Sequence, residues 1–292
     1  MHISEINIYP VKSLKGISVD AAMVEERGLQ YDRRWMLTTP DGMFFTQREF
    51  PRMATMSVWI EDDGSGLGVA AEGFGDVFIP IESDTHRRQQ VTIWHSVCEG
   101  SVYGGALNEW FSDVLGTDCQ LVYMSDDSRR EISERFNNGG EIISFADGYP
   151  LLLISEASLE DLNKRLDTSH AGGMPVVQLP INRFRPNIVI SGSDAFAEDT
   201  WKRLRVGEAI FRGTKPCERC VITTIDQSRG EVAGKEPLKT LASFRMAKDV
   251  VPDRLDELGM NPTAVLFGQN LIGETPGTTI GVGDEIEVLE VF

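Results

Sequence analysis

The chain has 292 residues, a formal net charge of −17 and a pI near 4.7. Hydrophobic residues make up 41% and charged residues 25%, which is typical of a globular protein and excludes a disordered one. An acidic surface repels nucleic-acid phosphates and anionic lipid, so we expect no nucleic-acid partner. Met1 to Leu14 contains no apolar signal segment, and the apolar runs are short, so we expect no membrane partner and a cytoplasmic location.

The first third of the chain has the pattern of short strands separated by polar, glycine-rich turns. Strands are predicted over Ile3–Tyr9, Ala21–Glu26, Arg34–Thr39, Met43–Thr46, Met53–Ile60 and Val77–Ile81. Their even spacing favours a barrel or a sandwich over alternating strands and helices.

A helix is predicted over Asn108–Leu115, where Gly116 ends it, and a strand follows over Gln120–Met124. The next stretch, Asp126–Gly140, is polar and charged, which is typical of a domain boundary. We therefore expect an N-terminal β-barrel-like domain over residues 1–125 and a larger β-rich domain over residues 126–292.

The second part again consists mostly of predicted strands. A strand over Leu151–Ile154 leads through Ser155 into a helix over Glu156–Leu166. One more short helix is predicted over Leu238–Phe244. Further strands are predicted over Asn187–Ser191, Arg203–Val206, Ala209–Arg212, Val221–Asp226 and Glu285–Val291. The predicted fold class is therefore mainly β, built from β-barrels with a few α-helices, with a ligand cleft between the two domains.

Cys217 and Cys220 form a CxxC, which can be half of a zinc site, a redox dithiol or a place where one thiolate binds another group. The chain has no second CxxC and no HxxxH pair, which disfavours zinc. A predicted strand after the pair disfavours a thioredoxin-type dithiol, which precedes a helix. Two buried cysteines without chemistry stay possible. The neighbouring Lys215 and Arg219 instead favour a thiolate, which is a ligand for a soft metal.

Cations also gather at predicted turns, in Lys12-Ser13, in Arg33 and in Arg185, which lies two residues before Asn187. A single lysine in such a place is most simply a solvated surface charge. Arg185 differs because it precedes Pro186 and lies between apolar residues, so it needs an anionic or carbonyl partner. In an acidic protein these groups are candidates for holding an anion.

Taken together, these segments resemble the MOSC superfamily in its two-domain form, and are most similar to its amidoxime-reducing branch. The resemblance runs from about residue 3 to residue 290. It is carried by Ile8–Ser13, Lys15-Gly16, Gly28-Leu29, Tyr31–Trp35, Ser155–Leu159, Arg183–Asn187, Ala197–Asp199 with Trp201, Cys217–Cys220, Thr223–Asp226, Phe267–Asn270 and Gly281–Asp284.

The resemblance implies a molybdenum cofactor, Mo-molybdopterin, whose metal is held by Cys220, the second cysteine of the pair. By matching position, the residues that hold the cofactor would be Lys12, Ser13, Arg33, Arg185 and Asn187, with Glu218 and Arg219 beside it. Glu218 is a departure, because relatives often have a small polar residue there. An acid at this position puts a phosphate contact in doubt.

The activity implied is reduction of N-hydroxylated compounds to amines or amidines. No cysteine follows Cys220 to bind an iron–sulfur cluster, so a separate ferredoxin-like or flavin-containing protein is expected to supply electrons. A second reading is a non-catalytic carrier of cofactor or sulfur, because MOSC modules also resemble the tail of molybdenum-cofactor sulfurases. The absence of a desulfurase domain favours the reductase. A third reading is a zinc-holding or metal-free β-barrel binding module.

Overall fold

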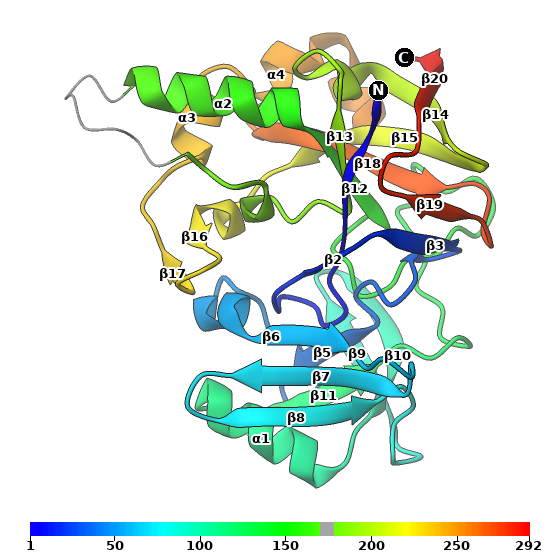
Figure 1. Ribbon diagram of the computed structural model, residues 1–292, viewed down its shortest axis with the longest axis vertical. Helices are drawn as coiled ribbons and strands as arrows, with labels where there is room; N and C mark the ends of the chain where they lie inside the picture. Colours follow the sequence, from blue (N-terminus) through cyan, green and yellow to red (C-terminus); the bar gives the residue numbers. More distant parts are fainter. Residues whose placement is uncertain (170–177) are drawn as a thin grey trace.

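A computed structural model describes residues 1–169 and 178–292, so His170 lies outside the described residues. The molecule consists of two β-rich lobes, one above the other in Figure 1, and both chain ends lie in the upper lobe. The fold is mainly β with a few short helices, as the sequence predicts.

An eight-stranded mixed sheet forms the upper lobe. Its strands, in spatial order, are β2 (Ile17–Val19), β1 (His2–Ile8), β13 (Ile188–Ser191), β12 (Leu151–Ser155), β18 (Leu266–Gly273), β15 (Ala209–Glu218), β14 (Trp201–Val206) and β20 (Ile286–Val291). Strands β12 and β13 run parallel, and α2 (Glu156–Ser169) begins the crossover that a parallel pair requires.

The sheet curls until its two sides meet. His2 of β1 forms an antiparallel bridge with Glu285, and Ile3 N donates to Asp284 O at 3.0 Å, just before β20 begins. Ile3, Ile6 and Phe211 are fully buried in the resulting core. Beside it, β3 (Ala21–Glu25) pairs with β4 (Gly28–Leu29) and with β19 (Thr279–Gly281). The curled sheet agrees with the predicted barrel.

The lower lobe packs two small sheets and one helix around a second core. One sheet has the order β5 (Trp35–Thr38), β11 (Gln120–Tyr123), β10 (Ser96–Val102) and β9 (Arg88–Ile93), and the other has the order β6 (Ser57–Ile60), β7 (Gly66–Ala71) and β8 (Gly75–Pro80). Helix α1 (Gly105–Leu115) ends at Gly116, whose φ of 71° is left-handed. Trp35 is buried at the centre, where its indole donates to Tyr103 Oη at 2.8 Å.

The short remaining elements lie in the C-terminal part of the chain. They are β16 (Ile225–Asp226), β17 (Glu231–Val232), α3 (Leu238–Ala242), α4 (Ala247–Val250) and α5 (Leu255–Leu258). Within the described ranges, no helix is both long enough and apolar enough to cross a membrane.

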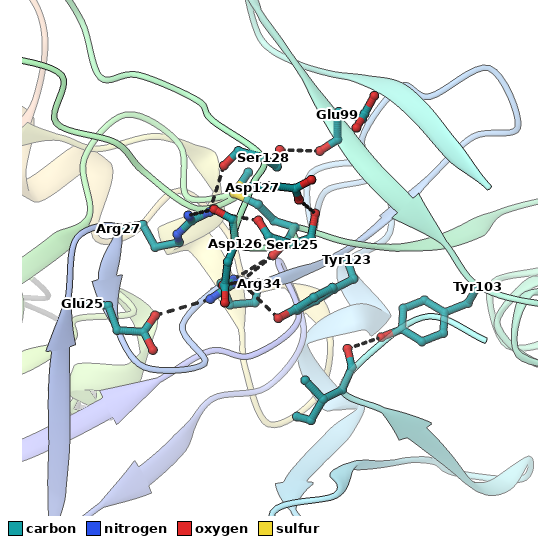
Figure 2. Close-up of polar contacts among 12 residues, drawn as sticks. Glu25, Arg27, Arg34, Glu99, Tyr103, Tyr123, Ser125, Asp126, Asp127 and Ser128 are labelled. Atoms are coloured by element: carbon teal, nitrogen blue, oxygen red, sulfur yellow. Dashed lines mark hydrogen bonds and ion pairs between the residues drawn. The ribbon is translucent and has the colours of Figure 1, made fainter. Parts of the chain in front are cut away.

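The domain boundary at residue 125 stays a prediction. Strands from before and after this residue pair with one another in the same sheets. Although β1, β2 and β3 come first in the sequence, they lie in sheets with C-terminal strands. The segment at the predicted boundary is also held tightly (Figure 2). Arg34 donates to Met124 O at 2.9 Å and to Asp126 at 2.6 Å, and Arg27 donates to Asp126 O at 3.0 Å. The start of this segment is therefore fixed by two arginines.

Three predicted strands differ from the structure. Over Val221–Asp226, residues Val221–Thr224 form a 3-10 helix and only Ile225–Asp226 a strand. The reason is local, because the hydroxyls of Thr223 and Thr224 donate back to the carbonyls of Cys220 and Val221. The predicted strand Met53–Ile60 begins only at Ser57, after a 3-10 helix that starts at Pro51. Met43–Thr46 forms isolated bridges instead of a strand.

Strand β18, which was not predicted, lies in the middle of the large sheet and is buried over nearly its whole length. Gln269 and Asn270 are polar and interrupt the run of apolar residues that would indicate a buried strand. They are tolerated because their amides donate to the carbonyls of Trp201 and Lys215.

Candidate functional site

A cavity of about 490 Å³ is lined by residues from both halves of the chain. All of the predicted site residues line it: Lys12, Ser13, Arg33, Arg185, Asn187, Glu218, Arg219 and Cys220. The fold thus brings together residues that are up to two hundred positions apart in the sequence. That they bind a cofactor stays a prediction. We call Lys12, Ser13, Arg33 and Arg185 the cation cluster, and Arg48, Cys217, Arg219 and Cys220 the sulfur cluster.

Two guanidinium groups of the cation cluster pack on one aromatic ring. The guanidinium carbons of Arg33 and Arg185 lie 4.4 Å and 4.2 Å from the centre of the Tyr9 ring. Burial raises the pKa of the Tyr9 phenol to about 12, although both cations act to lower it. Burial also lowers the pKa of Arg185 to about 10. At neutral pH the ring therefore stays neutral between two charged groups.

Arg33 is held in place by a buried hydrogen-bond network. Its Nη1 donates to Asp32 Oδ2 at 2.5 Å and to Asn187 Oδ1 at 3.0 Å. The Asn187 amide also donates to Asn7 O at 3.1 Å and accepts from the Leu152 N–H at 3.2 Å. Since both ends of the Asn187 amide are used within the protein, this residue positions Arg33 and ties β1 to β12.

The backbone around the cavity adopts a conformation that side chains rarely take. Ser13, Arg33 and Arg185 have φ values of 71°, 50° and 54°, and Trp94 at the cavity wall has 55°. Such left-handed residues are energetically costly and gather at functional sites. Three of the four are residues that the sequence predicts as ligand-binding.

Lys12 is buried beside an acidic partner that the sequence analysis did not identify. Its Nζ donates to Phe145 O at 2.7 Å and to the Asp147 carboxylate. Burial lowers the pKa of Lys12 to about 8, against the opposing effect of Asp147. Burial also acts to raise the pKa of Asp147, but Lys12 and then Arg48 hold it well below its ordinary value. Both groups are therefore charged at neutral pH.

The sulfur cluster contains two free thiols, each in contact with a guanidinium. Arg48 Nη2 donates to Cys220 Sγ at 3.0 Å, and Arg219 Nη1 donates to Cys217 Sγ at 3.1 Å. Arg219 is fixed further by a bond from Nη2 to Phe184 O at 2.7 Å. Each sulfur therefore accepts a hydrogen bond from a positively charged donor.

Glu218, the departure in the motif, does not leave an unpaired acid in the cavity. Its carboxylate accepts a hydrogen bond from Lys215 Nζ at 2.6 Å. The pair is partly exposed, with 39% of the Glu218 side chain accessible. The Glu218 carboxylate thus neutralises the charge of Lys215 at the cavity wall, which disfavours a phosphate contact at this position.

Within residues 1–169 and 178–292, no three or more His, Cys, Asp or Glu side chains lie together where they could hold a metal ion. A structural zinc site needs about four such ligands.

Arg48, Trp94 and Asp147 line the cavity but were not among the predicted residues. Arg48 had a usable signal, because it follows a predicted strand, Met43–Thr46, as Lys12 follows Ile3–Tyr9. Trp94 and Asp147 had no such signal in the sequence. The first lies in a hairpin turn between β9 and β10, and the second lies in a loop before β12.

Two family models match the chain: the MOSC N-terminal beta barrel domain over residues 1–118 and the MOSC domain over residues 140–287. The chain is 34% identical to mitochondrial amidoxime-reducing component 1 of Homo sapiens, covering 98% of this chain and 82% of that protein. It is 32% identical to mitochondrial amidoxime reducing component 2 of Bos taurus, covering 97% and 82%.

It is also 33% identical to the molybdenum cofactor sulfurase of Oryza sativa subsp. japonica, where the alignment covers 98% of this chain but 35% of that protein. The chain therefore spans about a third of the sulfurase. Matches to both family models and to relatives along nearly the whole chain agree with the two-lobed β fold. The chain belongs to the MOSC family, in the form that joins an MOSC N-terminal beta barrel domain to an MOSC domain.

Proposed function

We propose that this protein is a molybdenum-cofactor-dependent oxidoreductase that reduces N-hydroxylated compounds, with Cys220 as the protein ligand to the metal. The observation that carries the proposal is a single cavity that combines a thiol held by a guanidinium with a separate cluster of cations, two of which pack on Tyr9. Similarity to amidoxime-reducing components along nearly the whole chain supports the same class of reaction.

The chemistry of the cavity suits this cofactor. A pterin phosphate needs cationic and hydroxyl donors, and Lys12, Ser13, Arg33 and Arg185 supply them. Arg48 Nη1 is buried without a hydrogen-bond partner among the described residues, so the cavity has donor capacity that the protein itself does not use. A soft thiolate suits the metal.

When bound, the cofactor would supply the two-electron chemistry that accepts the substrate oxygen. The protein's own residues would have the remaining tasks. Arg33 and Arg185 bind the phosphate, and Asp32, Asn187 and Tyr9 keep these two cations in position. Asp147, ionised beside Lys12, is a charged acceptor facing the same cavity. Electrons would come from a separate redox protein.

The test is a reductase assay on a simple amidoxime, with an artificial electron donor, for protein from a molybdate-supplied host. Wild type should contain about one molybdenum per chain and turn over the amidoxime. Cys220→Ala should lose both, because it removes the ligand. Molybdenum-loaded wild-type protein that does not reduce any N-hydroxylated compound would refute the reductase.

A carrier of cofactor or sulfur is the second candidate, favoured by the 33% identity to a molybdenum cofactor sulfurase and by the second thiol, Cys217, in the same cavity. A carrier would transfer labelled sulfur or intact cofactor to an acceptor protein, without turnover of an amidoxime. The same preparation therefore separates the two functions.

A further inference from the structure

The contact between Arg48 and Cys220 joins the two lobes at the sulfur. Arg48 lies in the segment after β5, in the lower lobe, and Cys220 follows β15 of the upper lobe. The two residues are 172 positions apart, and Nη2 of Arg48 is 3.0 Å from Sγ of Cys220. The assignment of Cys220 as a metal ligand does not by itself explain why Arg48 contacts the sulfur.

The position of Arg48 is fixed by an aromatic neighbour. Its guanidinium carbon lies 4.5 Å from the centre of the Trp94 ring, and Phe44 packs edge-on against the same ring at 5.0 Å. Trp94 is in the hairpin turn between β9 and β10 and has a left-handed φ of 55°. Although 43% of this residue is exposed, the strained turn holds the indole against Arg48 at the cavity wall.

The chemistry of the contact is that of a cationic donor on a sulfur ligand. A hydrogen bond from a charged donor is stronger when the acceptor is anionic, as a ligating thiolate is. Hydrogen bonds to the sulfur of a metal ligand orient it and tune the reduction potential of the metal. Arg48 brings this charge close to the sulfur, and its Nη1 is buried with no hydrogen-bond partner in residues 1–169 and 178–292, a cost that a purely structural contact would not need.

We propose that Arg48, held by Trp94, is a positioning residue that fixes the Cys220 sulfur as a metal ligand and raises the reduction potential of the bound metal. The inference rests on the proposed function, since it takes Cys220 as the ligand. It adds a role for a residue of the N-terminal half, and it makes the contact between the two lobes at Arg48 a condition for a correctly tuned site.

The experiment compares the holoenzyme with three variants at this contact. Arg48→Gln removes the charge and keeps an amide donor, Arg48→Lys keeps the charge, and Trp94→Leu removes the ring beneath the guanidinium. Arg52→Gln is the matched control, because Arg52 lies in the same segment, is exposed, and packs on Phe74 at 5.9 Å away from the cavity. Molybdenum per chain and the midpoint potential of the bound metal are measured for each.

We expect Arg48→Gln to shift the midpoint potential to more negative values and to weaken metal retention by roughly 10-fold or more. Arg48→Lys should restore part of both, Trp94→Leu should shift the potential in the same direction by less, and Arg52→Gln should match wild type. Thermal unfolding of each variant verifies that it is folded.

An Arg48→Gln protein with wild-type molybdenum content and an unchanged potential would overturn the proposal. If Arg48→Gln does not fold, wild-type values in both Arg48→Lys and Trp94→Leu overturn it. A negative shift of equal size in Arg52→Gln also overturns it, because the effect would then follow from net charge. Wild-type protein without molybdenum would instead refute the proposed function on which the inference rests.

Discussion

The cation cluster and the sulfur cluster line one cavity but hold their charged groups differently. In the cation cluster, Arg33 and Arg185 are fixed by buried protein groups, through Tyr9 and the Asp32 carboxylate. In the sulfur cluster, Arg48 and Arg219 donate directly to thiols. The guanidinium groups of the first cluster are thus held by other protein groups, whereas those of the second donate to sulfur atoms, one of which is the proposed metal ligand. The comparison teaches that one cavity can hold its cations in two different ways.

The largest expected effect is a difference in bound molybdenum between variants of the two thiols of the sulfur cluster. Cys220→Ala should lower bound molybdenum to below about a tenth of wild type, since it removes the proposed ligand, whereas Cys217→Ala should keep most of it. Elemental analysis of both variants, purified in parallel, measures this. Equal loss in the two variants would mean that the sulfurs act as a pair, as in a dithiol, and would break the distinction between them.

The next effect tests whether the cation cluster depends on its own buried acid. Asp32→Ala leaves the Arg33 guanidinium without its carboxylate and the Tyr9 N–H without its acceptor. Removing one partner of a buried ion pair costs about 3–5 kcal/mol, so the free energy of unfolding should fall by that amount. Urea denaturation measures it. Arg88→Gln, which breaks the exposed pairs with Glu99 and Asp127, should lower the free energy of unfolding far less, and an equal loss would contradict the argument.

A pH-dependent effect tests the burial of Lys12. Its pKa is lowered from 10.5 to about 8, so between these values the unfolded chain binds more protons than the folded one. The contribution of Lys12 to the free energy of unfolding therefore rises as the pH increases from 8 to 10.5, by at most about 3 kcal/mol. Denaturation of wild type and of Lys12→Met at several pH values verifies this, because the variant should lack the rise. Inorganic phosphate should also bind more weakly above pH 8, as the lysine loses its charge.

The smallest effect concerns the aromatic ring shared by the two arginines. Tyr9→Phe keeps the ring for Arg33 and Arg185 but removes the hydrogen bond from the hydroxyl to Pro186 O, which is 3.1 Å long. We expect a loss of about 1 kcal/mol in stability and little change in phosphate affinity. Calorimetric titration with phosphate measures the second. A large loss of affinity would show that the hydroxyl itself contacts the ligand.

Much of the fold and most of the cavity could be predicted from the sequence, because their signals are local. Alternating apolar residues predict β1, and Gly116 marks the end of α1. The predicted site residues lie beside the ends of predicted strands or within the CxxC, where motifs are readable, and all of them line the cavity. The 3-10 helix at Val221–Thr224 was missed because threonine favours strands by propensity, whereas here the threonine hydroxyls bond to the backbone.

The sequence by itself determined the β-rich class, the family and part of the set of residues that gather at the cavity, because each depends on short patterns. Only the tertiary structure decided that β1 lies in a sheet with C-terminal strands, that Asn187 positions Arg33, and that Arg48 meets Cys220. These are contacts between segments far apart in the chain. Periodicity and motifs report what a residue does near its neighbours in sequence, whereas packing of the two lobes selects its partners in space.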